Sequence, residues 1–144
     1  MRRAWGWGWA CMLLLALPGC QRDTAELRLR KDMAALQEAV EERRLRDAME
    51  GVAEDFVGDA GMDRAALHNL LRAQFLTNAR IGNIVGPPSI ALQGNDANVR
   101  FDAVISGSQT RLVPERMQRY SVVTAWRVQD GRWRLRHAQW TPAE

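Results

Sequence analysis

The sequence predicts an α+β domain in which N-terminal helices pack in the concave face of a strongly bent antiparallel sheet. Apolar residues recur at helical spacing as far as about residue 78, and from Ile81 onward they alternate with the two-residue period of strands. Near the C-terminus, the dipeptide Asp130-Gly131 separates two alternating runs, which is a hairpin signal. Helices followed by a meander of strands favour one sheet that wraps around a long helix.

The first residues have the layout of an export signal. Arg2 and Arg3 precede an apolar run that extends to Leu17. The ending Leu17-Pro18-Gly19-Cys20 resembles the lipobox of bacterial lipoproteins, in which the cysteine is acylated, for example with palmitate, and the chain is cut before it. This resemblance implies a signal peptide at residues 1–19 and a lipid on Cys20. The alternatives are an ordinary cleaved signal or an uncleaved anchor, although the run is shorter than the roughly 20 residues of a spanning helix.

The lipobox resemblance also implies a location and a membrane partner. Gln21, rather than Asp, follows the cysteine, which in Gram-negative lipoproteins favours the outer membrane. We therefore expect a lipid-anchored protein of the cell envelope, on the periplasmic face of the outer membrane. Residues 20–23 are then the lipidated cysteine with a short tether, and residues 24–141 form one folded domain.

Cysteine and charge restrict the function classes. Cys11 and Cys20 are the 2 cysteines, so the domain itself is expected to have no disulfide and no thiol chemistry. Of the 20 Lys and Arg residues, Arg2 and Arg3 belong to the predicted signal, which leaves 18 basic side chains against 17 acidic ones. This balance gives no reason to expect nucleic-acid binding. The histidine and acid spacing predicts no metal site, and nothing indicates a cofactor.

Three helices are expected. The first starts at the N-cap Thr24, with a buried stripe made of Leu29, Met33, Leu36 and Val40 and a solvent side that includes Glu38, Glu41 and Glu42. The second has its apolar residues at Leu45, Met49, Val52 and Phe56 and ends before Gly58. The third is capped by Asp63 and runs to about Asn78, with a stripe of Leu67, Leu70, Leu71 and Phe75.

The remaining chain is expected to form strands. The segment 81–92 is interrupted by Gly86-Pro87-Pro88, which predicts a bulge or an edge strand because proline donates no ladder hydrogen bond. After a turn at 94–96, a half-buried strand places Val99, Phe101, Ala103 and Ile105 on one face. Residues 106–115 form a polar connection, and 120–128 with 133–140 form the closing hairpin.

A two-residue turn fixes the register of this hairpin. The more apolar face is expected to point inward, with the pairs Val128–Trp133, Trp126–Leu135, Thr124–His137 and Val122–Gln139. The outward face then holds Arg127 opposite Arg134, Ala125 opposite Arg136 and Ser121 opposite Trp140.

Two segments resemble the nuclear transport factor 2-like superfamily, which includes ketosteroid isomerases and polyketide-cyclase-like proteins. They are the helical segment 45–56 and the strand 130–135 followed by Trp140. The resemblance implies a cone-shaped fold whose interior can hold a ligand. It does not transfer an isomerase site, because Leu36 stands where the family's catalytic tyrosine is expected and residues 120–140 offer no inward acid. Asp59 lies near the position of the family's acidic base. We therefore assign no catalytic residue.

Two groups of side chains are candidate sites. The candidates for a pocket in the cone are His137, Thr124, Trp126, Gln139, Tyr120 and Asp59. The alternative for His137 is a core histidine hydrogen-bonded to the Thr124 hydroxyl. The candidates for a homodimer interface on the outer sheet face are Arg127, Arg134, Arg136 and Trp140, unless Asp102 neutralises the arginines.

These observations favour a non-catalytic, membrane-tethered module that binds a small amphipathic ligand or another envelope protein. The alternative is a lipid-anchored hydrolase, isomerase or cyclase that uses Asp59 and His137 as an acid and histidine pair. The two functions differ in whether these two side chains meet in one cavity.

Overall fold

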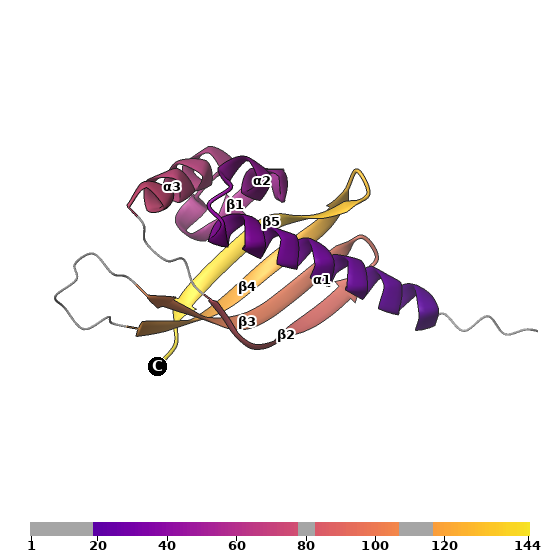
Figure 1. Cartoon of the computed structure of the whole chain (residues 1–144). Helices are drawn as coiled ribbons and strands as arrows, with labels where there is room; N and C mark the ends of the chain where they lie inside the picture. Colours follow the sequence, from indigo (N-terminus) through magenta and orange to yellow (C-terminus); the bar gives the residue numbers. More distant parts are fainter. Residues whose placement is uncertain (1–18, 78–82, 107–116) are drawn as a thin grey trace, which may run out of the picture.

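The computed structural model describes residues 19–77, 83–106 and 117–144, so the predicted signal peptide and most of the polar connection 106–115 lie outside the described residues. Helices α1, α2 and α3 pack on one side of a mixed sheet with the strand order β1-β5-β4-β3-β2 (Figure 1). The predicted α+β architecture is confirmed. The core lies between α1 and the facing side of the central strands.

Helix α1 spans Gly19–Glu41 and crosses the concave face of the sheet, and its N-terminal part extends beyond the strands (Figure 1). It begins at Gly19 rather than at Thr24, so residues 20–23 are helical. Its buried side includes Leu29, Met33 and Ala39, while Leu36 and Val40 pack against the same core. The predicted stripe is confirmed.

The second predicted helix is wrong in its second half. Helix α2 covers Leu45–Glu50, and the next residues form strand β1, Val52–Gly58. Val52 pairs with Leu135 and Gly58 with Ala138, and this pairing with β5 is parallel, so the sheet is mixed rather than wholly antiparallel. Helical spacing suggested a continuous helix, yet adjacent Val52 and Ala53 are both buried. The parallel pairing with β5 and the cover that α2 and α3 give this segment hold it as a strand.

Helix α3, Arg64–Leu76, follows a short 3₁₀ turn at Asp59–Gly61. The predicted cap is confirmed, because the Asp63 carboxylate accepts a hydrogen bond from the Ala66 N–H at 2.8 Å. Arg64 then donates from Nη2 to the Met49 carbonyl at 2.8 Å and so caps the C-terminus of α2. The two short helices and β1 therefore form one packed unit.

Strands β2 (Asn83–Gln93) and β3 (Asp96–Ser106) form the first antiparallel pair. β2 is an edge strand whose register shifts between Val85 and Ser89, where Gly86-Pro87-Pro88 lies. The prediction of an edge strand with an irregularity is confirmed.

Strands β4 (Met117–Gln129) and β5 (Arg132–Pro142) form the closing hairpin. Asp130 and Gly131 have φ values of 52° and 75°, which is the left-handed backbone that a two-residue hairpin turn requires. The turn and the first pairs, from Gln129–Arg132 to Trp126–Leu135, agree with the prediction.

A bulge in β5 then changes the register. Trp126 pairs with Leu135, but Ala125 pairs with His137, so Arg136 is an extra residue on the β5 side. Thr124 consequently faces Ala138, and the predicted pair of Thr124 with His137 is wrong. Beyond the bulge the predicted faces of the β5 side chains are exchanged, while those of the β4 side chains are unchanged. The buried positions Leu135 and Ala138 are separated by two residues, which the strict alternation of a regular strand does not allow.

Polar contacts fix α1 to the hairpin. The Asp32 carboxylate accepts the Trp133 N–H at 2.9 Å, which joins α1 to β5. Inside the sheet, the Thr124 hydroxyl donates to the Val99 carbonyl at 3.2 Å and accepts from Trp126 Nε1 at 2.9 Å. Both hydrogen-bonding roles of this buried threonine are therefore used within the core.

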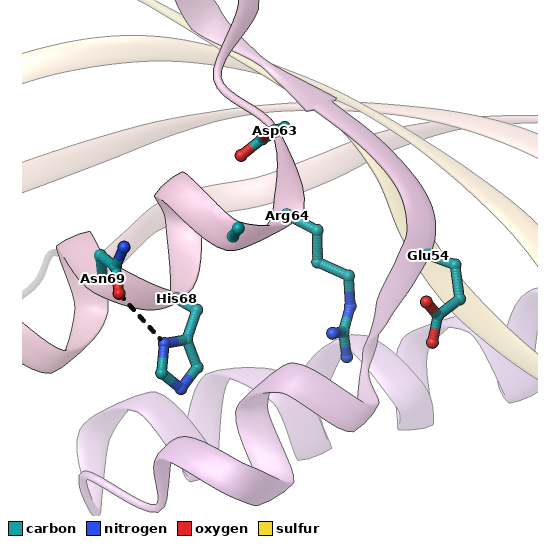
Figure 2. Close-up of a pocket in the computed structure, with 6 residues that line it drawn as sticks. Glu54, Asp63, Arg64, His68 and Asn69 are labelled. Carbon is teal, nitrogen blue, oxygen red and sulfur yellow. Dashed lines mark hydrogen bonds between the residues drawn. The ribbon is translucent and has the colours of Figure 1, made fainter.

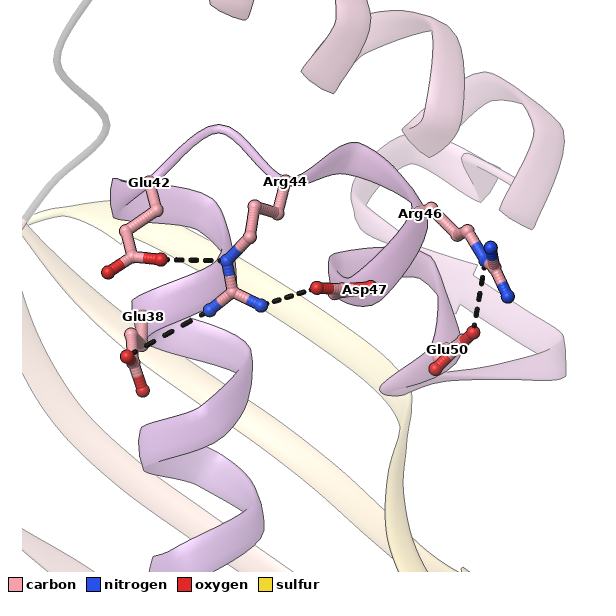
Figure 3. A network of polar contacts seen from close by, with 6 residues as sticks. All are labelled: Glu38, Glu42, Arg44, Arg46, Asp47 and Glu50. Carbon is pink, nitrogen blue, oxygen red and sulfur yellow. Dashed lines mark hydrogen bonds and ion pairs between the residues drawn. The ribbon is translucent and has the colours of Figure 1, made fainter.

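The turn between α1 and α2 is held by Arg44, whose guanidinium contacts Asp47, Glu42 and Glu38 (Figure 3). Hydrogen bonds to Asp47 and then Glu42 raise the pKa of Arg44. Because these side chains are exposed, solvent screens the ion pairs, and we interpret them as a structural connection. Within the described ranges, no helix is long and apolar enough to span a membrane.

Candidate functional site: a cavity between the first helix and the sheet

A cavity of about 180 Å³ lies between α1 and the inner face of the sheet. One side of it is a single face of α1, because residues three and four apart lie one above the other on a helix. That side consists of Met33, Leu36, Gln37, Val40 and Glu41. The other side comes from four strands and consists of Ile84, Phe101, Ala103, Thr124, Trp126 and Leu135.

The walls of this cavity are largely apolar. Thr124 is 5% exposed, and its hydroxyl is already engaged by Val99 and Trp126. The other two polar side chains, Gln37 and Glu41, belong to the last turns of α1. Gln37 Nε2 donates to Glu41 Oε1 at 2.9 Å, so the two form one polar pair. The cavity thus has an apolar body and a single acidic end.

Of the predicted pocket residues, the structure brings Thr124 and Trp126 to the cavity. Both belong to β4, whose regular alternation is not disturbed by the bulge in β5, so both point inward as predicted. Tyr120 shares this inner face but is not among the residues that line the cavity, since it lies further along β4 and pairs with Pro142.

His137 and Gln139 lie on the outer face of the sheet, contrary to the prediction. The bulge at Arg136 shifts the alternation, so that Ala138 and Trp140 take the inward positions. His137 Nδ1 donates to the Val57 carbonyl at 2.7 Å, across the parallel pair of β5 and β1. Its imidazole therefore supports the edge of the sheet, and neither Thr124 nor the cavity is its partner.

Asp59 lies in the 3₁₀ turn that follows β1, outside the cavity lining. The structure therefore does not bring Asp59 and His137 together at the cavity.

Gln37 and Glu41 were not predicted as site residues, and Glu41 was expected on the solvent side of the first helix. The signal that could have found them is their spacing. Gln37 and Glu41 are four residues apart and directly follow Leu36 and Val40, so they flank the buried stripe. Residues at the edge of a stripe are the ones that can reach the rim of a cavity under the helix.

A second concave region is an open groove beside α3, lined by Glu54, Asp63, Arg64, Ala65, His68 and Asn69. Figure 2 shows that Arg64 and His68 extend to one side of α3, while Asp63 lies at its start. Asp63 caps the helix and Arg64 caps α2, and His68 Nδ1 makes only a long contact of 3.5 Å with Asn69 Oδ1. Two of the charged side chains here thus already have structural partners.

The outer sheet face carries the predicted arginines. Arg127 faces Arg134 as expected, but their acidic partner is not Asp102. Arg127 Nε is 3.0 Å from Asp96 Oδ1, Arg136 Nη1 is 4.0 Å from the same oxygen, and Arg134 Nη2 is 3.8 Å from Asp130. Arg134 Nε is buried without a hydrogen-bond partner.

Trp140 lies on the opposite, inner face, where it packs against the core. It therefore cannot belong to an interface on the outer face. Across the described ranges, no group of three histidine, cysteine or acidic side chains is arranged to hold a metal ion.

No protein-family model matches the sequence, and no curated protein matches it. Solved structures do match. A protein of unknown function from Mycobacterium tuberculosis superposes with a TM-score of 0.72 at 18% identity, covering 90% of this chain and 78% of that one. A putative scytalone dehydratase from Novosphingobium aromaticivorans gives 0.73 at 15% identity over 87% and 89% of the two chains.

A nuclear transport factor 2-like protein of unknown function from Pseudomonas putida gives a TM-score of 0.68 at 15% identity, covering 83% of this chain and 87% of that one. At these identities the similarity establishes the fold and leaves the chemistry open.

Proposed function

We propose that this nuclear transport factor 2-like cone domain is a non-catalytic module that binds a small ligand in the cavity under α1. The observation that supports this proposal is the composition of the cavity: a largely apolar lining that includes two aromatic side chains, with one polar pair at one end. Such a lining provides burial for an apolar molecule, and a few polar groups orient it.

The cavity volume limits the ligand to a small molecule. Cavities for drug-sized ligands have volumes of about 300–1,000 Å³, whereas an apolar cavity of about 150 Å³ accommodates benzene. With about 180 Å³, the cavity fits one ring or a short branched chain.

The alternative of a hydrolase, isomerase or cyclase depended on Asp59 and His137 sharing one cavity. Neither of them lines the cavity under α1, and His137 bonds to the backbone of β1. Binding therefore remains the function that the geometry supports better.

Binding can be tested with native mass spectrometry of the chain purified from its host, followed by calorimetry with single-ring probes. Ala103 lines the cavity, so Ala103→Leu should fill it and abolish probe binding while the circular dichroism spectrum stays unchanged. Ala91→Leu is the matched control, because Ala91 is exposed on the edge strand β2. Equal probe binding by the parent and the Ala103→Leu variant would contradict the proposal.

We further propose that Cys20 carries a lipid anchor that holds the domain at the periplasmic face of the outer membrane. The Leu17-Pro18-Gly19-Cys20 segment supports this part of the proposal. Several acyl chains, each contributing about 0.8 kcal/mol per buried methylene, give durable attachment. The Cys20→Ser variant should leave the membrane fraction or accumulate as a precursor, and unchanged fractionation and migration would refute the anchor.

A further inference from the structure

The acidic end of the cavity indicates which class of ligand it selects. Among the described residues that line the cavity, Glu41 is the one with an ionisable side chain. We propose that Glu41 binds the head group of the ligand, and that the ligand is a small primary amine with an apolar ring or chain. This inference rests on the proposed binding function and adds the ligand's charge and polarity.

The hydrogen bond within the polar pair decides which groups remain for a ligand. Gln37 donates one amide hydrogen to Glu41 Oε1 at 2.9 Å. The unoccupied lone pairs of the Glu41 carboxylate and the Gln37 carbonyl oxygen are acceptors. Gln37 keeps one further amide N–H, so acceptors outnumber donors at this end of the cavity. A ligand head that donates hydrogen bonds matches this excess, and an ammonium group offers three donors together with the complementary charge.

The helix end favours the same sign of charge. Gln37 and Glu41 lie in the last turns of α1, which ends at Glu41. The C-terminus of a helix carries partial negative charge on its terminal carbonyl groups, so a cation near it is stabilised and an anion is disfavoured. The helix end and the carboxylate therefore act in the same direction.

Glu41 does not take part in the ion pairs that surround Arg44. The Arg44 guanidinium contacts Glu38, Glu42 and Asp47, all on the side of the turn between α1 and α2 (Figure 3). Glu41 instead pairs with Gln37, along the cavity face of the helix. Adjacent glutamates at the end of α1 thus have different roles: Glu42 holds the turn, and Glu41 lies at the cavity.

The apolar part of the ligand is set by the opposite wall. Phe101 and Trp126 line the cavity together with Leu36 and Leu135. Aromatic walls favour a flat ring, and the volume of about 180 Å³ admits a single one. A benzylamine-like molecule, with its ring between the sheet and α1 and its ammonium at Glu41, fits both the size and the polarity.

Three probes of nearly equal shape separate the charge preference from cavity binding: benzylamine, benzyl alcohol and benzoate. Calorimetry on the parent chain should give the tightest binding for benzylamine, weaker binding for benzyl alcohol and the weakest for benzoate. Because Glu41 is exposed, the advantage of benzylamine over benzyl alcohol should be modest, about three- to tenfold, and should decrease as salt is added.

The variant Glu41→Gln keeps the side-chain size and an acceptor for Gln37 but removes the charge. It should reduce benzylamine binding to the level of benzyl alcohol and leave benzyl alcohol within about twofold of the parent. Glu42→Gln is the matched control, because Glu42 is the next residue and its partner is Arg44. It should leave the binding of all three probes unchanged.

The outcomes distinguish the two proposals. Benzyl alcohol binding that Ala103→Leu abolishes, without any preference for benzylamine, would retain the cavity and overturn the amine proposal. A preference for benzylamine that survives Glu41→Gln would also overturn it. If none of the three probes binds to the parent chain, the proposed cavity function fails, and the amine inference fails with it.

Discussion

The two faces of the β4–β5 hairpin are made by the same strands but are stabilised in different ways. The inner face holds Trp126, Trp133 and Leu135, which are buried against α1. The outer face holds Arg127 and Arg134 directly opposite each other. Their ion-pair partners, Asp96 and Asp130, are exposed to solvent. Apolar burial stabilises a structure in proportion to the area removed from water, whereas exposed ion pairs contribute little. We therefore expect substitutions on the inner face to control stability and ligand binding, and substitutions on the outer face to control association.

A single residue decides which β5 side chains belong to which face. Arg136 is the extra residue of the β5 bulge, and beyond it Ala138 and Trp140 point inward while His137 and Gln139 point outward. A strand without the bulge would place the opposite set against α1. The boundary between the two faces of β5 is therefore set by a local irregularity.

The largest expected effect comes from removing a contact between α1 and the inner face. Leu29 is 0% exposed, and Leu29→Ala should lower the free energy of unfolding by about 2–5 kcal/mol because it leaves a cavity in the core. Leu27 lies on the same helix but is 67% exposed, so Leu27→Ala should change it by less than about 0.5 kcal/mol. Urea denaturation measures both. Similar values for the two variants would contradict the packing of α1 on the sheet.

A smaller effect is expected from the polar group inside the core. Thr124→Val keeps the shape but removes the hydroxyl that serves Val99 and Trp126, so the indole N–H loses its acceptor. The expected loss in the free energy of unfolding is about 1–3 kcal/mol. Thr141→Val, at an exposed position of β5, is the control and should be close to neutral. A neutral Thr124→Val variant would show that the hydroxyl is dispensable.

His137 tests the position of the bulge. Because its imidazole donates to the Val57 carbonyl at the sheet edge, His137→Leu should cost about 0.5–1.5 kcal/mol of unfolding free energy. Probe binding should stay at the parental level, because the side chain lies on the outer face. Loss of binding in calorimetry, with stability retained, would place His137 back in the cavity and would refute the β5 register.

The smallest effect on stability is expected on the outer face. Arg134→Glu replaces a like-charge pair with an opposite-charge pair, so the free energy of unfolding should change by less than about 1 kcal/mol. We propose that this face binds a second copy of the chain, because Arg127, Arg134 and Arg136 share two carboxylates there, Asp96 and Asp130, and a second copy could supply further acidic partners. Analytical ultracentrifugation should then show a dimer for the parent and a monomer for Arg134→Glu.

Arg46→Glu is the control for association, since Arg46 is exposed and lies on α2 rather than on the strands that carry the outer face. It should leave the dimer intact. A parent chain that stays monomeric at high micromolar concentration would refute the dimer.

The elements that could be predicted are those whose signals are local. The Asp63 cap, the Asp130-Gly131 turn and the irregular edge strand at Pro87 each depend on the conformation of a few neighbouring residues, and all three are confirmed. Strand β1 could not be predicted in the same way, because this segment becomes a strand by pairing in parallel with β5, which is far away in the sequence. Its apolar residues have a spacing that fits a helix equally well.

The candidate site was predicted only in part for a related reason. Thr124 and Trp126 belong to β4, whose alternation the bulge does not disturb, and were assigned correctly, whereas His137 and Trp140 follow the extra residue in β5 and were assigned to the wrong faces. A bulge has no turn dipeptide to mark it, and here it depends on β5 being held between two strands. Glu41 was missed because the cavity exists only once α1 lies on the sheet.

Because α1 is continuous from Gly19 to Glu41, the predicted lipid attachment site and the acidic end of the cavity lie at opposite ends of one helix. At 1.5 Å per residue, Cys20 and Glu41 are separated by about 30 Å along the helix axis. If Cys20 is embedded in a bilayer, an upright helix would hold the acidic end about one helix length above the lipid surface. The ligand would then be collected from the aqueous compartment rather than from the membrane, and a helix-breaking Pro at Thr24 would allow the domain to tilt and lose this fixed height.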